Sequence, residues 1–166
     1  MGQEIRNEEN KIMFSQTVIN EIEDIRKKYP TARAALLPAL YVAQREFGWL
    51  SPEAYTAVSD LLGVPEAIAR GVGTFYAMYK NRPLGRNVIQ LCTNVSCMIL
   101  GAEKLVDFLK NKYGLEPGGT TEDNRFSLVI MECIGACGTA PAMLVNDDFY
   151  ENLTEKYIDE ILGRYK

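Results

Sequence analysis

Four cysteines are the side chains of this sequence best suited to chemistry. They form two pairs, Cys92 with Cys97 and Cys133 with Cys137, in the patterns C-x4-C and C-x3-C. Thiolates bind soft metals and also act as nucleophiles. No histidine is present among the 166 residues. Ser-His-Asp and Cys-His triads, histidine zinc sites, Rieske centres and haem held by a proximal histidine are therefore excluded.

The cysteine spacing leaves several interpretations open. The first is a [2Fe–2S] cluster, in which each iron takes two cysteine sulfurs. The second is structural zinc held by four cysteines, in a module that serves interaction and not redox chemistry. The third is a dithiol redox enzyme, although that class typically carries C-x-x-C, which is missing here. Four buried thiols without any metal are the plainest alternative.

The residues around the cysteines favour the cluster. Gly135 and Gly138 allow the backbone to approach sulfur closely and to adopt positive φ where a turn needs it. Loop amides can then donate hydrogen bonds to the cluster, which shifts its reduction potential. A helix expected to start at Cys97 would direct its partial positive end toward the anionic cluster.

Each cysteine pair is expected where a β-strand ends. A β-prone run at 87–91 precedes Cys92, and another at 126–131 precedes Cys133. If these strands are neighbours in one sheet, both loops lie at the same edge and the four thiolates converge. The remaining elements expected in this α/β half are a helix at 97–113, with Met98, Ala102, Leu105 and Leu109 inward, a strand at 142–145, a turn at 146–148, and a helix at 154–164.

The first half of the chain is predicted to be helical, with helices near 15–28, 31–47, 51–62 and 66–72. Ser51-Pro52-Glu53 is typical of a helix start, with an N-cap, a proline and an acid in the first turn. Pro38 lies within the second predicted helix, so that helix either begins only a turn before it or bends there.

Composition and charge divide the chain into three segments. Residues 1–80 are expected to form a helical bundle, 81–86 (Asn-Arg-Pro-Leu-Gly-Arg) a linker, and 87–166 an α/β domain. The acidic surplus lies in the last segment.

The net charge of −4 argues against nucleic-acid binding. The N-terminus has no signal-peptide pattern and no apolar run is long enough to cross a membrane, so a soluble, cytoplasmic protein is expected.

Several segments match one known family across nearly the whole chain. They are Cys92-Thr-Asn-Val-Ser-Cys97, Gly118-Gly-Thr-Thr-Glu-Asp123, Glu132-Cys-Ile-Gly-Ala-Cys-Gly138, Ala140-Pro141, Val145-Asn-Asp-Asp-Phe-Tyr-Glu-Asn152, Gln44-Arg-Glu-Phe-Gly-Trp-Leu50 and Gly71-Val-Gly-Thr-Phe-Tyr76. With these segments the sequence resembles the 24 kDa-type subunit of respiratory complex I, called NuoE in bacteria. The resemblance implies a thioredoxin-like [2Fe–2S] ferredoxin domain behind a small helical bundle.

The resemblance also implies residue roles. Cys92 and Cys97 would hold one iron of the cluster, and Cys133 and Cys137 the other. The chain would be an electron-transfer subunit without catalytic residues of its own in an NADH:quinone oxidoreductase. It would exchange one electron at a time with FMN on a larger NuoF-type flavoprotein subunit that oxidises NADH.

The resemblance places this subunit among the other peripheral-arm subunits, on the cytoplasmic face of the inner membrane and without direct membrane insertion. NAD-linked hydrogenases and formate dehydrogenases use close relatives of the same subunit, so the host complex stays open.

Gly71-Val-Gly73 is followed by Tyr76 where G-x-G-x-x-G needs a third glycine. NADH is therefore expected to bind on the partner.

Two further features carry open interpretations. Phe75, Tyr76 and Tyr79 either anchor the flavoprotein partner, because aromatic residues are enriched at interface hot spots, or pack between the two halves of this chain. A cis peptide bond before Pro141 is one interpretation that the sequence leaves open.

Overall fold

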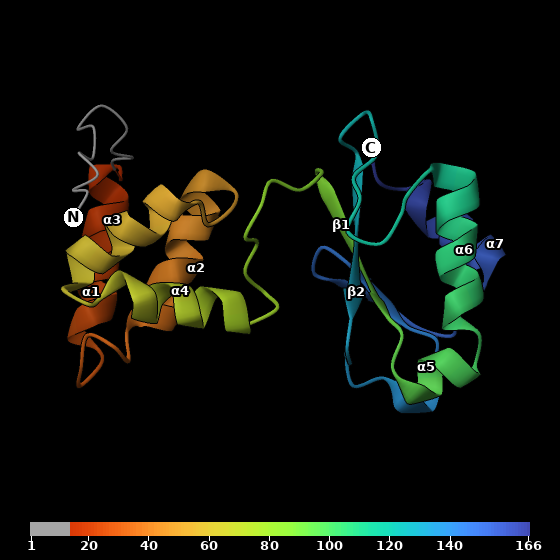
Figure 1. Cartoon of the computed structure of the whole chain (residues 1–166), viewed down its shortest axis with the longest axis horizontal. Coiled ribbons are helices and arrows are strands. Elements are labelled where there is room, and N and C mark those ends of the chain that lie inside the picture. Colours follow the sequence, from red (N-terminus) through yellow and green to blue (C-terminus); the bar gives the residue numbers. More distant parts are fainter. Residues whose placement is uncertain (1–13) are drawn as a thin grey trace, which may run out of the picture. The chain divides into compact units, whose positions relative to one another are not determined.

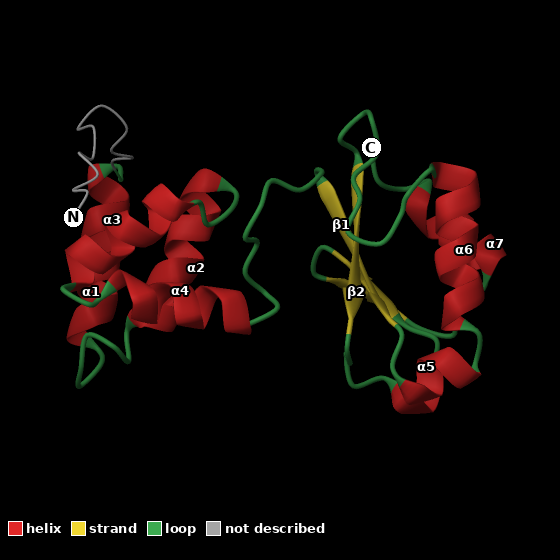
Figure 2. Ribbon diagram, in the orientation of Figure 1, coloured by secondary structure: helices red, strands yellow, loops and turns green. Residues whose placement is uncertain are grey.

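The computed structural model describes residues 14–166, and the chain divides into two compact units after Pro83 (Figure 1). The first unit consists of helices and loops, and the second combines a β-sheet with helices (Figure 2). The predicted order, with helices before an α/β domain, is confirmed. No helix of residues 14–166 is long and apolar enough to cross a membrane.

Four helices make up the described part of the first unit. They are α1 (Gln16–Lys27), α2 (Leu36–Phe47), α3 (Pro52–Leu62) and α4 (Glu66–Phe75). The Ser51 hydroxyl caps α3 by accepting a hydrogen bond from the Ala54 N–H at 3.1 Å. Helix α2 contacts the other three helices, and their apolar faces form one buried cluster that includes Ile22, Leu40 and Val58.

The observed start of helix α2 explains how a helix accommodates Pro38. It begins at Leu36, so Pro38 lies in the first turn, where its missing N–H has no partner within the helix in any case. The predicted start at residue 31 is wrong, because residues 31–35 form turns. The alternative of a helix that begins a turn before the proline is confirmed.

The second unit contains a four-stranded sheet in the order β2-β1-β3-β4. Its strands are β1 (Asn87–Cys92), β2 (Phe126–Met131), β3 (Met143–Val145) and β4 (Asp148–Tyr150). Strands β1 and β2 are parallel, whereas the other two pairs are antiparallel. Helices α6 (Ala102–Tyr113) and α7 (Glu155–Leu162) lie on the same face of the sheet (Figure 1). The core beneath them includes Leu91, Leu109 and Ile158.

Gly101 divides the helix predicted at 97–113. A five-residue helix, α5 (Val95–Ile99), comes first, and α6 begins at Ala102. Gly101 has φ of +96°, a left-handed conformation that a helix interior does not adopt. Met98 consequently lies outside the core and is exposed, which contradicts its predicted inward position, while Leu105 and Leu109 are buried as predicted.

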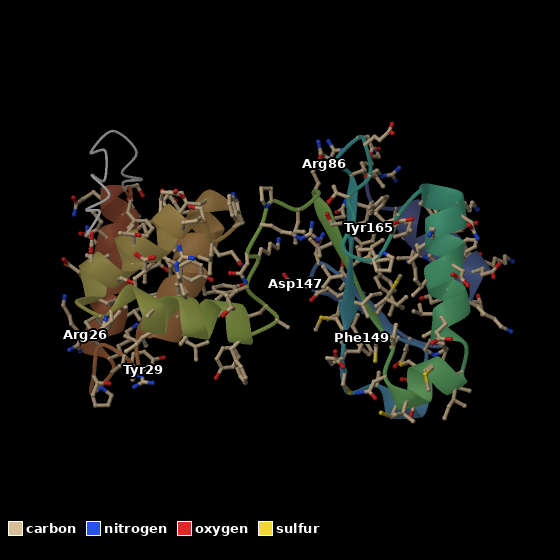
Figure 3. The ribbon with its side chains drawn as sticks, in the orientation of Figure 1. Arg26, Tyr29, Arg86, Asp147, Phe149 and Tyr165 are labelled. Atoms are coloured by element: carbon tan, nitrogen blue, oxygen red, sulfur yellow. The ribbon has the colours of Figure 1, made fainter. Side chains whose placement is uncertain are left out.

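The turn after β3 is confirmed, but it is shorter than predicted. Val145 pairs with Asp148, so only Asn146 and Asp147 form the loop of a hairpin. Asn146 has φ of +56°, as primed hairpin turns require. Strand β4 is not predicted by the sequence, because none of its three residues is buried and its first residue, Asp148, is typical of a turn. Asp147 lies on the side of the sheet away from α6 (Figure 3).

Each end of segment 81–86 is hydrogen-bonded to the unit that it adjoins. The Asn81 side-chain amide donates to the Gly73 carbonyl at 2.8 Å in the helical unit. In the sheet unit, the Gly85 N–H donates to the buried Ser127 hydroxyl at 2.7 Å. A Cβ on Gly85 would lie 2.9 Å from the Phe126 backbone, so this position needs a glycine.

Candidate metal centre

The parallel pairing of β1 and β2 brings the two cysteine loops to one edge of the sheet. Cys92 is the last residue of β1 and pairs with Met131 at the end of β2, two residues before Cys133. Cys97 follows on α5, and Cys137 begins a short 3-10 helix, Cys137–Thr139. The expectation that the two loops share one edge is confirmed.

All four cysteines line one pocket of about 140 Å³. The other lining residues are Asn94, Val95, Ser96 and Ala136. Cys92 and Cys97 are each 3% exposed, whereas Cys133 and Cys137 face solvent. All four are free thiols. One pair is thus fixed in the interior, and the other pair closes the pocket from an exposed loop.

The donor set consists of two cysteine pairs around one pocket. A [2Fe–2S] cluster takes two thiolates at each iron, so this donor set fits it. Four thiolates around one ion are also the ligand set of structural zinc, and metal analysis separates the two.

Backbone N–H groups surround the sulfur atoms. The Gly135 N–H donates to Cys133 Sγ at 3.3 Å, and Gly135 has φ of +80°. The expectation that this glycine adopts positive φ beside a sulfur is confirmed. Gly138 does not lie in that region, so the structure gives it no such role.

The two buried thiols differ in acidity. Burial acts to raise the pKa of Cys92, but hydrogen bonds from the Asn94 and Ile134 N–H groups and from neighbouring thiols outweigh it, so this pKa lies below its ordinary value. Burial and the neighbouring Cys92 sulfur raise the pKa of Cys97, while the Ala142 N–H donates to its sulfur and acts in the opposite direction. Cys92 is the more readily available thiolate of this pair.

The aromatic residues near the end of the helical unit divide into two kinds. Phe75 is 79% exposed, and its ring meets that of Tyr76 edge to face at 5.0 Å. Tyr79 is buried and donates from its hydroxyl to the Leu37 carbonyl at 2.7 Å. Tyr79 is therefore a core residue of its own unit, and Phe75 with Tyr76 forms an exposed aromatic surface.

A second exposed apolar surface is one that the sequence reasoning missed. Val95, Met98, Ile99 and Leu100 all face solvent on or just after α5, the helix that carries Cys97. Ile99 alone is 73% exposed. The signal for this surface is Gly101, which ends the helix before its apolar residues can reach the core beneath α6.

The peptide bond between Ala140 and Pro141 is cis. The interpretation of Pro141 as a cis proline is therefore confirmed.

Residues 22–166 match the family described as thioredoxin-like [2Fe–2S] ferredoxin. The chain belongs to this family, and its membership supports an iron–sulfur cluster. The resemblance that the cysteine motifs indicated is confirmed.

Within this family the chain is similar to complex I subunits. It is 40% identical to the E 2 subunit of NADH-quinone oxidoreductase from Rhizobium meliloti (strain 1021), over 90% of this chain and 89% of that protein. It is 39% identical to mitochondrial NADH dehydrogenase [ubiquinone] flavoprotein 2 of Dictyostelium discoideum, over 98% of this chain and 67% of that one. The corresponding NADH-quinone oxidoreductase subunit of Rickettsia bellii (strain RML369-C) is likewise 39% identical, over 92% of this chain and 93% of that protein.

A solved structure of an NAD+-reducing [NiFe]-hydrogenase in its air-oxidized state also resembles the fold. Its TM-score is 0.66 and its identity 26%, over 78% of this chain. This chain spans only 22% of the length of that hydrogenase chain. The two chains share a fold, and most of the hydrogenase chain has no counterpart here.

Proposed function

We propose that this chain transfers single electrons through one [2Fe–2S] cluster, as the NuoE-type subunit of an NADH:quinone oxidoreductase. Cys92 and Cys97 would hold one iron, and Cys133 and Cys137 the other. The observation that carries the proposal is the arrangement of these cysteines as two pairs around one pocket at the edge of the sheet.

When bound, a [2Fe–2S] cluster supplies a site that stores and releases one electron, at a potential set by charge, hydrogen bonds and solvent exposure. The chain's own residues set these conditions. Burial of Cys92 and Cys97 excludes water on one side of the pocket. The Gly135 and Ala142 N–H groups donate toward the sulfurs of Cys133 and Cys97. Hydrogen bonds to thiolate sulfur favour the reduced cluster, because they offset its extra negative charge.

NADH and FMN would bind to a larger flavoprotein partner. The glycines of Gly71-Val-Gly73 lie inside α4, and a Cβ on Gly73 would collide with the Tyr55 ring. Gly73 therefore serves helix packing, whereas a phosphate-binding turn would place its glycines in a loop before a helix. The packing role of Gly73 supports the proposal that hydride transfer to flavin takes place on the partner and that this chain accepts electrons from that flavin.

The exposed apolar residues of α5 support docking close to the cluster. Cys97 and Ile99 belong to the same five-residue helix, so a partner that covers Ile99 comes close to the cluster's ligands. Large apolar side chains gathered on a soluble surface mark interaction sites. The exposed ring of Phe75 offers a second contact from the helical unit. We place the chain in the cytoplasm, held to the membrane only through its complex.

An NAD-linked hydrogenase is the second candidate host. The structural likeness to the hydrogenase chain favours this host. That chain is only 26% identical to this one, however, whereas the Rhizobium meliloti protein is 40% identical. The two hosts differ in the partners that copurify with the chain, while the cluster and the flavoprotein contact would be equivalent.

The test is metal analysis of protein purified without air. We expect two irons and two sulfides per chain, with no zinc, and a spin-half EPR signal after dithionite reduction. Colourless protein with one zinc per chain would replace the proposal with a structural zinc module. Colourless protein that stays free of metal after anaerobic reconstitution with iron and sulfide would favour a thiol enzyme.

A further inference from the structure

We propose that Asn152 is a positioning residue for the cluster, although it lies outside both cysteine loops. This inference rests on the proposed function, since it concerns the geometry of the same four cysteines. Asn152 lies between β4 and α7, at the cysteine edge of the sheet, because β4 runs in the same direction as β1. Its φ is +52°, and its side chain is exposed.

The backbone at Asn152 holds the segment that follows Cys137. The Asn152 N–H donates to the Thr139 carbonyl at 2.7 Å, and the N–H of the buried Leu153 donates to the Pro141 carbonyl at 3.0 Å. Thr139 in turn closes the 3-10 helix that begins at Cys137, because its N–H donates to the Ala136 carbonyl at 3.1 Å.

The same segment reaches the other cysteine pair through Ala142. The Ala142 carbonyl accepts from the Cys92 N–H at 3.2 Å, and the Ala142 N–H donates to the Cys97 sulfur. Residues 137–142 therefore connect three of the four cysteines. The backbone N–H groups of Asn152 and Leu153 hold this segment in place through their hydrogen bonds to it. A substitution at Asn152 that shifts this backbone therefore moves Cys137 and the Ala142 N–H while every residue that lines the pocket keeps its identity.

The left-handed backbone is what position 152 requires. Most side chains are strained at positive φ, whereas asparagine tolerates it and glycine adopts it freely. The Asn152 side chain points to solvent and has no hydrogen bond within residues 14–166. Its requirement for asparagine or glycine thus comes from the backbone, because φ at Asn152 sets the orientation of its own N–H, bonded to Thr139, relative to the Leu153 N–H, bonded to Pro141.

The experiment compares three variants of the anaerobically purified, cluster-containing chain. Asn152→Ala introduces the strain, and Asn152→Gly restores the left-handed backbone. Asn124→Ala is the matched control, because Asn124 also has positive φ (54°) but lies in the turn before β2, at the opposite end of that strand from the cysteines. The readouts are the rate of iron loss to a chelator and the reduction potential by EPR titration, with circular dichroism as a check on folding.

We expect Asn152→Ala to lose iron on the order of fivefold faster than the wild type. Its potential should be more negative, because the Ala142 N–H moves away from the Cys97 sulfur. Asn152→Gly and Asn124→Ala should keep the wild-type potential and iron-loss rate. Asn152→Ser supplies the same comparison if Asn152→Ala does not fold.

Equal effects of Asn152→Ala and Asn124→Ala would overturn this inference, because they would reduce Asn152 to a general contributor to stability. Wild-type values in Asn152→Ala would overturn it as well. In both of these results the wild type still contains the cluster, so the proposed function stands. A wild-type chain that binds no iron or sulfide would overturn both proposals.

Discussion

The backbone N–H of Gly135 donates to the sulfur of Cys133, with 3.3 Å between nitrogen and sulfur. Gly135 has a positive φ, which turns the chain sharply between Cys133 and Cys137. Cys133 is exposed, so without such donors its thiolate would rely on solvent alone. Cys92 receives a hydrogen bond at the same separation along the chain, from the Asn94 N–H, so each cysteine loop provides a local donor to its first sulfur.

Replacing Gly135 with alanine should weaken the site in two measurable ways. Alanine at φ of +80° costs about 1–2 kcal/mol, so the free energy of unfolding should fall by that amount in denaturant titrations. Rotation of the amide away from Cys133 should also make the reduction potential more negative. Gly138→Ala is the control, since φ there is not positive and a Cβ would meet open space. Identical behaviour of the two variants would show that the Gly135 amide has no effect on the cluster.

Replacing Cys133 with alanine should abolish the normal cluster. One iron would then have only a single cysteine ligand. The visible absorption and the iron content should therefore fall to the values of protein without a cluster. The circular dichroism spectrum of the fold should stay unchanged, because Cys133 is exposed. Ser96→Ala, also in the pocket lining, should keep both iron and colour. An unchanged spectrum in Cys133→Ala would remove this residue from the ligand set.

The convergence of the cysteines could be predicted from the sequence because it depends on short, regular patterns. Each pair follows a β-prone run, and parallel strands with a helical crossover end at the same edge of a sheet. The parallel register of β1 and β2 confirms that reasoning. The α/β fold class and the buried positions of Leu105 and Leu109 follow from the same regularities.

Features that depend on single residues are predicted less well. The pattern at 97–113 is helical throughout, and only the backbone at Gly101 shows that the helix stops and starts again in a new direction. Strand β4 has no buried residue, so no apolar pattern marks it, whereas the equally short β3 buries Met143 and Val145. The contact of Asn152 with Thr139 joins segments that share no pattern, so only the folded chain reveals it.

Tyr79 should make the helical unit sensitive to alkaline pH. Burial, followed by the nearby Tyr55 and Tyr76 hydroxyls, raises the pKa of Tyr79 to about 12, from an ordinary value of 10.0. A phenol whose pKa is raised in the folded state stabilises the fold below its unfolded pKa. This contribution is lost as the pH rises from about 10 to about 12.

Tyr79→Phe separates this effect from other alkaline titrations. At pH 7 the variant should be about 1 kcal/mol less stable, because the Leu37 carbonyl loses its hydrogen bond. Between pH 10 and 12 its stability should fall less steeply than that of the wild type, as followed by denaturant unfolding. Tyr41→Phe is the control, because Tyr41 is exposed. Parallel pH profiles for Tyr79→Phe and wild type would contradict the assignment.

The exposed aromatic pair at the end of α4 should matter for the complex and not for the cluster. Replacing both Phe75 and Tyr76 with alanine should abolish copurification of the flavoprotein partner, since interface hot spots each contribute about 2 kcal/mol or more, roughly thirtyfold in affinity. Iron content should stay at the wild-type value, because neither residue lines the cysteine pocket. Thermal stability should fall only slightly, through loss of the contact between the Tyr76 ring and the buried Tyr79 ring. Tyr41→Ala, at an exposed position of α2, should leave copurification unchanged. Retention of the flavoprotein by the double variant would show that docking relies on other surfaces, and the apolar residues around Ile99 would then be replaced next.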